Sequence, residues 1–158
     1  MPGLRIGYLV APDRYVAAVA NRQLVTNWMA TPMVAEIASR WISDGTAAEL
    51  VLWQREALRN RYAIAAEILG DTPYHAHRDG LHVWLPLPEN RSEEGFVAQA
   101  RLQGVAIAPG ISFRFSDAPW RPAVRISLGS TDEADLRGGL GVVTKLLLAD
   151  PEHLLLAI

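Results

Sequence analysis

The sequence predicts an α/β chain, with helices in its first part and a small α+β lobe with an antiparallel sheet in its second part. In the first 70 residues, apolar residues recur at helical spacing between proline and glycine breaks. From about residue 72 the pattern changes to short β-type runs divided by turn-forming pairs such as Asp79-Gly80. A helix of about 23 residues, roughly 35 Å long at 1.5 Å per residue, is expected between the two parts.

Residues 1–45 have the pattern of a fragment of a larger lobe. The run from Leu4 to Ala11 is apolar, which is typical of a buried strand. A strand that starts almost at residue 1 has no preceding element in this sequence that would lie beside it. We therefore expect residues 1–45 to be a remnant of a large domain, with one strand and two helices.

Three helices are expected in the first half of the chain. They cover residues 14–25, 32–43 and 46–69. Each begins at or just after a residue whose side chain can cap a helix start: Asp13, Thr31 and Thr46. Gly45 and Gly70 follow the second and third helices, at positions where a left-handed residue commonly ends a helix. We assign residues 46–70 to one interdomain helix.

Residues 71–158 carry the signals of a small C-terminal α/β domain. Strands are expected over residues 74–78, 81–87, 105–108, 111–115 and 123–128. Ser92 is expected to cap a helix over residues 93–103. The run at residues 130–133 matches a capping box and opens a last helix that ends near residue 149.

Composition excludes several classes of function. The net charge of −2 gives no electrostatic footprint for nucleic acid. The absence of cysteine excludes disulfides, thiolate catalysis and cysteine-based metal sites. No apolar run approaches the roughly 20 residues of a membrane span, and no signal peptide is recognisable at the N-terminus. We expect a cytoplasmic protein with no membrane partner.

Two arginines stand in apolar strand patterns, Arg5 in GLRIGY and Arg125 in AVRISL. An unpaired guanidinium inside such a strand would be costly. A guanidinium can also give two parallel N–H bonds to a phosphate or a carboxylate, which makes both residues candidate ligand-binding groups. The alternative is that each is an ordinary surface cation, at a strand end for Arg5 and at an outward-facing position for Arg125.

The surroundings of these arginines resemble two segments of the fold-type-I aminotransferases. GLRIGYLVAP resembles the strand just after the cofactor lysine, and PAVRISLG resembles the late strand of the small lobe. The resemblance implies the aspartate-aminotransferase-like fold, here its C-terminal small domain with the connecting helix and a fragment of the large domain. It also implies that Arg5 binds the phosphate of pyridoxal 5'-phosphate and that Arg125 binds the carboxylate of an amino acid.

Two further segments resemble one subfamily of aminotransferase-like proteins more than the others. Residues 79–89, DGLHVWLPLPE, and residues 104–110, GVAIAPG, resemble the small lobe of the MocR-type regulators. These are GntR-family transcription factors with an aminotransferase-like domain behind a winged-helix domain. The resemblance implies an amino-acid effector, a homodimer, and DNA contact only through an upstream winged-helix domain that this chain lacks.

The resemblance places the cofactor lysine before residue 1. Lys145 is the only lysine of the chain, and no Ser-x-Ser precedes it. We expect Lys145 to be a solvated cation near a helix end. The chain is therefore expected to contain no catalytic residue, to contribute to pyridoxal phosphate binding in the intact protein without forming the covalent bond itself, and neither to transaminate nor to bind an operator alone.

Three functions stay open at this point. The chain is expected to be the effector-binding segment of a MocR-type regulator, or alternatively a fragment of a genuine class I/II aminotransferase that acts on an amino acid and a 2-oxo acid. A third possibility is a binding or assembly module that uses no cofactor. A metal site is not expected at His75, His77 and His82, because no carboxylate or further histidine completes it at a familiar spacing.

Overall fold

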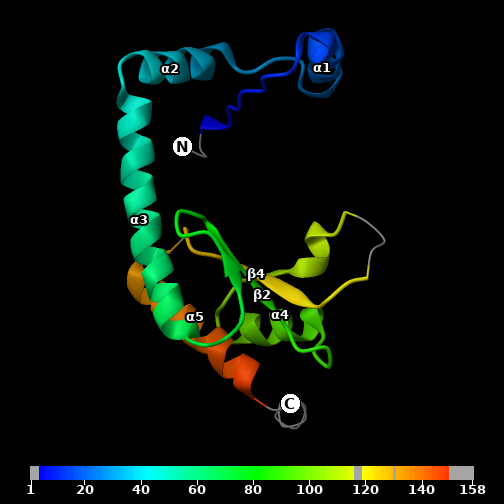
Figure 1. Cartoon of the computed structure of the whole chain (residues 1–158), viewed down its shortest axis with the longest axis vertical. Coiled ribbons are helices and arrows are strands. Elements are labelled where there is room, and N and C mark those ends of the chain that lie inside the picture. The colour runs from blue at the N-terminus through cyan, green and yellow to red at the C-terminus, as the bar shows by residue number, and fades with distance from the viewer. Residues whose placement is uncertain (1–3, 116–118, 130, 150–158) are drawn as a thin grey trace. The chain divides into compact units, whose positions relative to one another are not determined.

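The computed structural model describes residues 4–115, 119–129 and 131–149 (Figure 1). The chain divides into two compact units, Met1–Trp53 and Gln54–Ile158. The boundary between the units falls inside helix α3, which spans Thr46–Leu69. In the part of the chain that the structure describes, no helix is both long enough and apolar enough to cross a bilayer.

The first unit contains α1 (Asp13–Asn27), α2 (Pro32–Ser43) and the first residues of α3. The three helices confirm the prediction to within two residues at each end. Pro32 is the first residue of α2, where the missing N–H has no helical partner to lose. Gly45 has a φ of 90° and stands between α2 and α3, so the expected left-handed helix stop is also confirmed.

The helix starts are predicted better than their caps. Asp13 is the first residue of α1 and Thr31 precedes α2, but neither side chain makes a capping hydrogen bond. At the start of α3, Asp44 Oδ1 accepts a bond of 2.9 Å from the backbone N–H of Thr46. This bond lowers the pKa of Asp44 below its usual value.

The strand predicted over residues 4–11 is wrong in this structure. Residues 5–12 have no regular secondary structure, and Tyr8, Leu9 and Val10 are exposed, Val10 to 95%. A strand is stable only where a neighbouring strand pairs with its N–H and C=O groups. In the described residues of the first unit the regular elements are helical, so nothing there offers that pairing.

The second unit is built on a four-stranded antiparallel sheet with the order β1-β2-β4-β3. Its strands are β1 (His75–Ala76), β2 (His82–Pro86), β3 (Ala108–Pro109) and β4 (Ala123–Ser127). The helices of this unit are the rest of α3, α4 (Glu93–Leu102) and α5 (Glu133–Leu148). The sheet and helices confirm the predicted α+β lobe, although β1 and β3 are shorter than expected.

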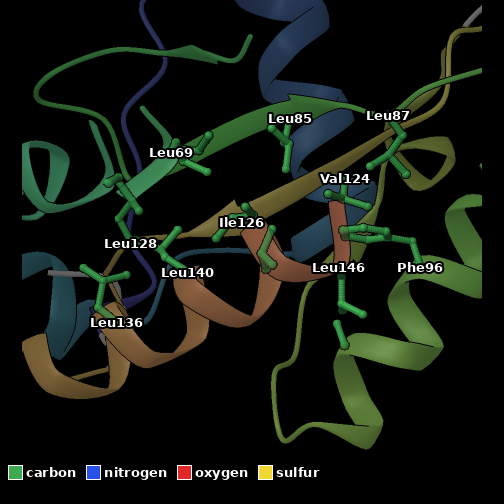
Figure 2. Close-up of a cluster of buried hydrophobic side chains, with 14 of the residues drawn as sticks. Leu69, Leu85, Leu87, Phe96, Val124, Ile126, Leu128, Leu136, Leu140 and Leu146 are labelled. Atoms are coloured by element: carbon green, nitrogen blue, oxygen red, sulfur yellow. The ribbon is translucent and has the colours of Figure 1, made fainter. Parts of the chain in front are cut away.

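One face of the sheet forms the core. Alternate residues of β2 and β4 are fully or almost fully buried, and they pair across the strands as Val83 with Ile126 and Leu85 with Val124. Helices α3, α4 and α5 all pack their apolar side chains against this face, as Figure 2 shows for several of them. The core residues drawn from helices include Leu69, Phe96, Leu136, Leu140 and Leu146.

Two helix starts in this unit are capped by side chains. Ser92 Oγ accepts a bond of 3.2 Å from the N–H of Gly95, which confirms the predicted cap of α4. At α5 the N-cap is Asp132, whose Oδ1 accepts from the N–H of Asp135 at 2.8 Å. The first residue of the expected capping box, Ser130, lies outside the described residues.

The strand expected over residues 111–115 does not form. The structure has the 3-10 helix η2 (Gly110–Phe113) there instead. The N–H of Ile111 donates to Glu93 Oε2 at 2.7 Å, so a side chain takes the donor that a strand would use in a ladder. The strand is therefore replaced by a 3-10 helix because of a contact between α4 and η2, and the residues around 111–115 carry no signal for this contact.

Candidate ligand-binding site

Arg125 lies at the centre of β4, on the face of the sheet opposite the core. It pairs with Trp84 of β2 on one side and with Ala108 of β3 on the other. Its strand neighbours Val124 and Ile126 are buried in the core, and side chains alternate along a strand. The half-buried Arg125 side chain therefore stands on the face that the helices leave uncovered.

Three aromatic side chains, Trp84, Phe113 and Trp120, form what we call the aromatic shell of Arg125. The guanidinium carbon of Arg125 lies 4.1 Å from the centre of the Phe113 ring, a cation–π contact. Trp84 meets Phe113 and Trp120 edge to face, with ring centres 6.1 and 6.2 Å apart. The N–H groups of a guanidinium point outward from its edge, so a carboxylate is expected to approach Arg125 there.

Gly110 allows the backbone of η2 to approach this shell closely. A Cβ atom at Gly110 would lie 2.8 Å from the carbonyl oxygen of Ala123 and 3.1 Å from atoms of both Trp84 and Trp120. A side chain therefore has no room at this position. The packing places Phe113, three residues further on, beside Arg125.

His82 lies two residues before Trp84 on β2 and so belongs to the same face of the sheet. Its pKa is lowered from the usual 6.5, first by partial burial and second by the positive charge of Arg125. The imidazole is therefore neutral at pH 7. A carboxylate bound to Arg125 would weaken the repulsion and raise the pKa of His82, which makes this histidine a reporter for the site.

Arg5, the other predicted site residue, belongs to the first unit and is exposed. Its φ of 50° is in the left-handed region, which costs an L-residue other than glycine roughly 1–2 kcal/mol. An exposed guanidinium has the right chemistry to bind a phosphate. Arg125 belongs to the second unit, and the predicted convergence of the two arginines on one ligand stays a prediction.

The other candidate residues have ordinary surroundings. Lys145 is exposed in the last turn of α5, as expected for a solvated cation. His77 Nδ1 accepts a bond of 3.1 Å from the N–H of Asp79 in the turn between β1 and β2. Among the residues that the structure describes, no group of three or more histidine, cysteine or acidic side chains is arranged to hold a metal ion.

Sequence reasoning missed much of what surrounds Arg125. Nothing in the sequence distinguishes Trp84 or Trp120 as neighbours of this arginine, and the pattern around Phe113 predicts a strand. Glu93 was treated only as the start of a helix, yet its buried carboxylate bonds to Ile111, Trp120 and Ala123. An acidic residue beside a capping serine is common, so the sequence carried no signal for this role.

Comparison with known proteins gives the family. Residues 1–142 match the family described as aminotransferase class I and II. The chain therefore belongs to the class I and II aminotransferase family, as the resemblance implied.

Its relatives include both regulators and enzymes. The chain is 26% identical over 144 residues to the uncharacterized HTH-type transcriptional regulator YisV of Bacillus subtilis, covering 88% of this chain and 29% of the regulator. It is 28% identical over 155 residues to the 2-aminoadipate transaminase of Thermus thermophilus, covering 94% of this chain and 39% of the enzyme. The chain thus spans 29–39% of the length of these two relatives.

A solved structure supports the fold. The α-aminoadipate aminotransferase LysN of Thermus thermophilus superposes with a TM-score of 0.81 at 21% sequence identity, over 99% of this chain and 40% of that protein. LysN was solved in complex with N-(5'-phosphopyridoxyl)-L-leucine. The predicted aminotransferase-like fold is therefore confirmed.

Proposed function

We propose that this chain is the C-terminal, effector-binding segment of a GntR/MocR-type transcriptional regulator. In the intact protein it would take part in binding pyridoxal 5'-phosphate and an amino-acid effector. Family membership and the similarity to an HTH-type regulator support this proposal. The observation that supports it most is Arg125, held on the uncovered face of the sheet with an aromatic ring against one side of its guanidinium.

In this proposal Arg125 binds the α-carboxylate of the amino acid through the N–H groups at the edge of its guanidinium. Arg5 binds the phosphate of the cofactor, and the exposed position of its side chain is compatible with this role. When bound, pyridoxal phosphate supplies an aldehyde that reacts with amino groups. The covalent attachment of the cofactor belongs to a lysine outside this chain.

The regulatory output is proposed to come from a shift between conformations. A ligand that binds one arrangement of the lobes more tightly than another shifts the population toward it. We propose that α3 connects the large and small lobes in the intact protein. DNA would be contacted by a winged-helix domain outside this chain, in a cytoplasmic protein.

Homodimerisation is also proposed. Several large apolar side chains of the first unit are exposed, and such surfaces commonly pack against a partner. They include Tyr8, Leu9, Val10, Trp28, Met29 and Met33. Light scattering of the intact protein should give the mass of a dimer, and a strictly monomeric species at high concentration would contradict the proposal.

The effector role can be tested with the intact protein loaded with pyridoxal phosphate. Addition of amino acids one at a time should change its visible absorbance for the effector and alter its affinity for the DNA upstream of its own gene. Arg125→Gln should weaken the absorbance response to the effector at least 10-fold, because a bidentate charged contact is replaced by a neutral one. An unchanged response would show that Arg125 does not bind the carboxylate.

A genuine aminotransferase is the second candidate, favoured by the similarity to the 2-aminoadipate transaminase over 94% of this chain. The same loaded protein should then convert an amino acid such as 2-aminoadipate to its 2-oxo acid in the presence of a second 2-oxo acid. Turnover over many cycles would support the enzyme. An absorbance response to the effector without turnover would support the regulator.

A further inference from the structure

Glu93 is a buried carboxylate at the first position of α4, with 7% of its surface exposed. Its Oε1 atom accepts bonds of 2.8 Å from the indole Nε1–H of Trp120 and of 2.8 Å from the backbone N–H of Ala123. Its Oε2 atom accepts from the N–H of Ile111 at 2.7 Å. Charge-assisted bonds of this kind, with the positive end of the helix dipole, offset the cost of burying the charge.

The three donors come from the three segments that surround Arg125. Trp120 is a member of the aromatic shell, and Ala123 is the first residue of β4, two positions before Arg125. Ile111 lies in η2, whose last residue, Phe113, makes the cation–π contact with the guanidinium. One carboxylate on α4 therefore ties the strand that carries the arginine to η2, whose Phe113 contacts the guanidinium, and to Trp120, which packs edge to face on Trp84.

We propose that Glu93 is a positioning residue of the Arg125 site. It fixes Trp120, η2 and the start of β4 relative to one another, so that the Phe113 ring stays in contact with the guanidinium and the N–H groups are presented to a carboxylate. This inference rests on the proposed function in one respect, that Arg125 binds a carboxylate. The placement of the aromatic shell by Glu93 is independent of that function.

The geometry requires a carboxylate and not merely a polar side chain of the same size. Glutamine offers one acceptor oxygen, and its NH₂ group is a donor. Glu93→Gln would therefore set a donor against at least one of the three N–H groups of Ile111, Trp120 and Ala123. Glu93→Asp keeps both acceptors but is one methylene shorter, so it is expected to satisfy some of these donors and to rescue the site in part.

The test uses the indole N–H signal of Trp120 and the Nε–H signal of Arg125 in the NMR spectrum of the intact, cofactor-loaded protein. Trp120→Phe and Arg125→Lys assign the two signals. In Glu93→Gln the Trp120 signal should move upfield and exchange faster with water even where the amide oxygen still faces the indole, because a neutral oxygen accepts a weaker bond than a carboxylate oxygen. The Arg125 signal should broaden, because the N–H of Ile111 in η2 then faces the NH₂ group. Glu93→Asp should give intermediate values for both.

Binding is measured with 4-methylvalerate, a carboxylate without an amino group. Its affinity should fall about 10-fold in Glu93→Gln, the effect of misplacing an orienting group without removing it. Combining Glu93→Gln with Trp120→Phe should weaken binding by less than the product of the two single effects, because both changes act through the same contact.

Arg91 supplies a matched control, since it is buried to a similar degree, with 9% exposed, just before α4. Its Nη2 atom donates to the carbonyl oxygens of Leu147 and Ala149 near the end of α5 and not to the aromatic shell. Arg91→Gln should lower stability but leave the Trp120 and Arg125 signals and the affinity for 4-methylvalerate unchanged.

Two outcomes would overturn the proposal. One is an unchanged pair of NMR signals in Glu93→Gln, and the other is an equal loss of affinity in Arg91→Gln and Glu93→Gln, which would indicate a general structural effect. If 4-methylvalerate does not bind to the unmodified protein, the proposed carboxylate site fails. The two NMR signals still decide whether Glu93 positions the aromatic shell.

Discussion

The two units of the chain differ in how they bury apolar residues. Among the described residues, the first unit has one buried hydrophobic residue, Ala38, and the second has the whole of the core cluster around β2 and β4. Within α1, all of which the structure describes, no residue is buried. Both units have helices with apolar residues at helical spacing. In the second unit these residues form a core, whereas in the first unit most of them are exposed.

This difference in burial indicates where the stability of each unit comes from. Apolar burial provides most of the stability of a fold, so the second unit contains its own source of stability. The apolar residues of the first unit can contribute comparably only when another surface covers them. This is the arrangement expected of a piece of a large domain, and Arg125 with its aromatic shell belongs to the unit with the core.

The two units should differ most when each is prepared as a separate peptide. A peptide of residues 54–158 should unfold in one cooperative transition, whereas a peptide of residues 1–53 should show none. The reason is that only the former contains a contiguous core. Circular dichroism during heating measures both, and a cooperative transition in the peptide of residues 1–53 would contradict this account.

Substitutions in the two units should differ strongly in cost. Leu85→Ala should lower the free energy of unfolding by about 3 kcal/mol, because it leaves a cavity beside fully buried neighbours. Leu9→Ala, at a residue that is 74% exposed, should change it by less than about 0.5 kcal/mol. Urea denaturation gives both values, and equal losses would mean that Leu9 is covered in solution.

Two glycine substitutions compare the packing around the aromatic shell of Arg125 with that of an ordinary helix surface. Gly110→Ala should cost about 1–3 kcal/mol, because the new Cβ would collide with the Ala123 carbonyl and the two tryptophans. Gly138→Ala, in α5 with no atom within 4 Å of the added Cβ, should stabilise by about 0.5–1 kcal/mol. The same denaturation experiment measures both changes. An unchanged free energy of unfolding in Gly110→Ala would show that the aromatic shell can shift to accommodate the new Cβ.

The smallest expected effect is a pH dependence at His82. Its pKa is lowered in the folded protein, so below pH 6.5 the unfolded state binds more protons than the folded state. Stability should therefore fall as the pH drops from 6.5 to the lowered folded value, and His82→Gln should remove that part of the loss. NMR titration of His82 should also show its pKa rising in Arg125→Gln, and an unchanged pKa would exclude the charge effect.

Features that depend on residues close together in the chain could be predicted from the amino-acid sequence alone. Pro32 and Gly45 set the ends of α2, and Ser92 sets the start of α4, because capping and left-handed stops are local interactions. The alternation in β4 also placed Arg125 in a strand whose neighbours are buried. The family resemblance followed from the same short segments.

The surroundings of Arg125 and the choice of which segments form strands depend on contacts between residues far apart in the chain. Glu93 bonds to residues 18, 27 and 30 positions away, and these bonds replace an expected strand with η2. The expected strand over residues 4–11 is missing for the complementary reason, that the described residues of the first unit contain no strand to pair with it. Both depend on partners distant in sequence, and the hydrogen bonds of a strand or a buried carboxylate are satisfied only when those partners are brought into place.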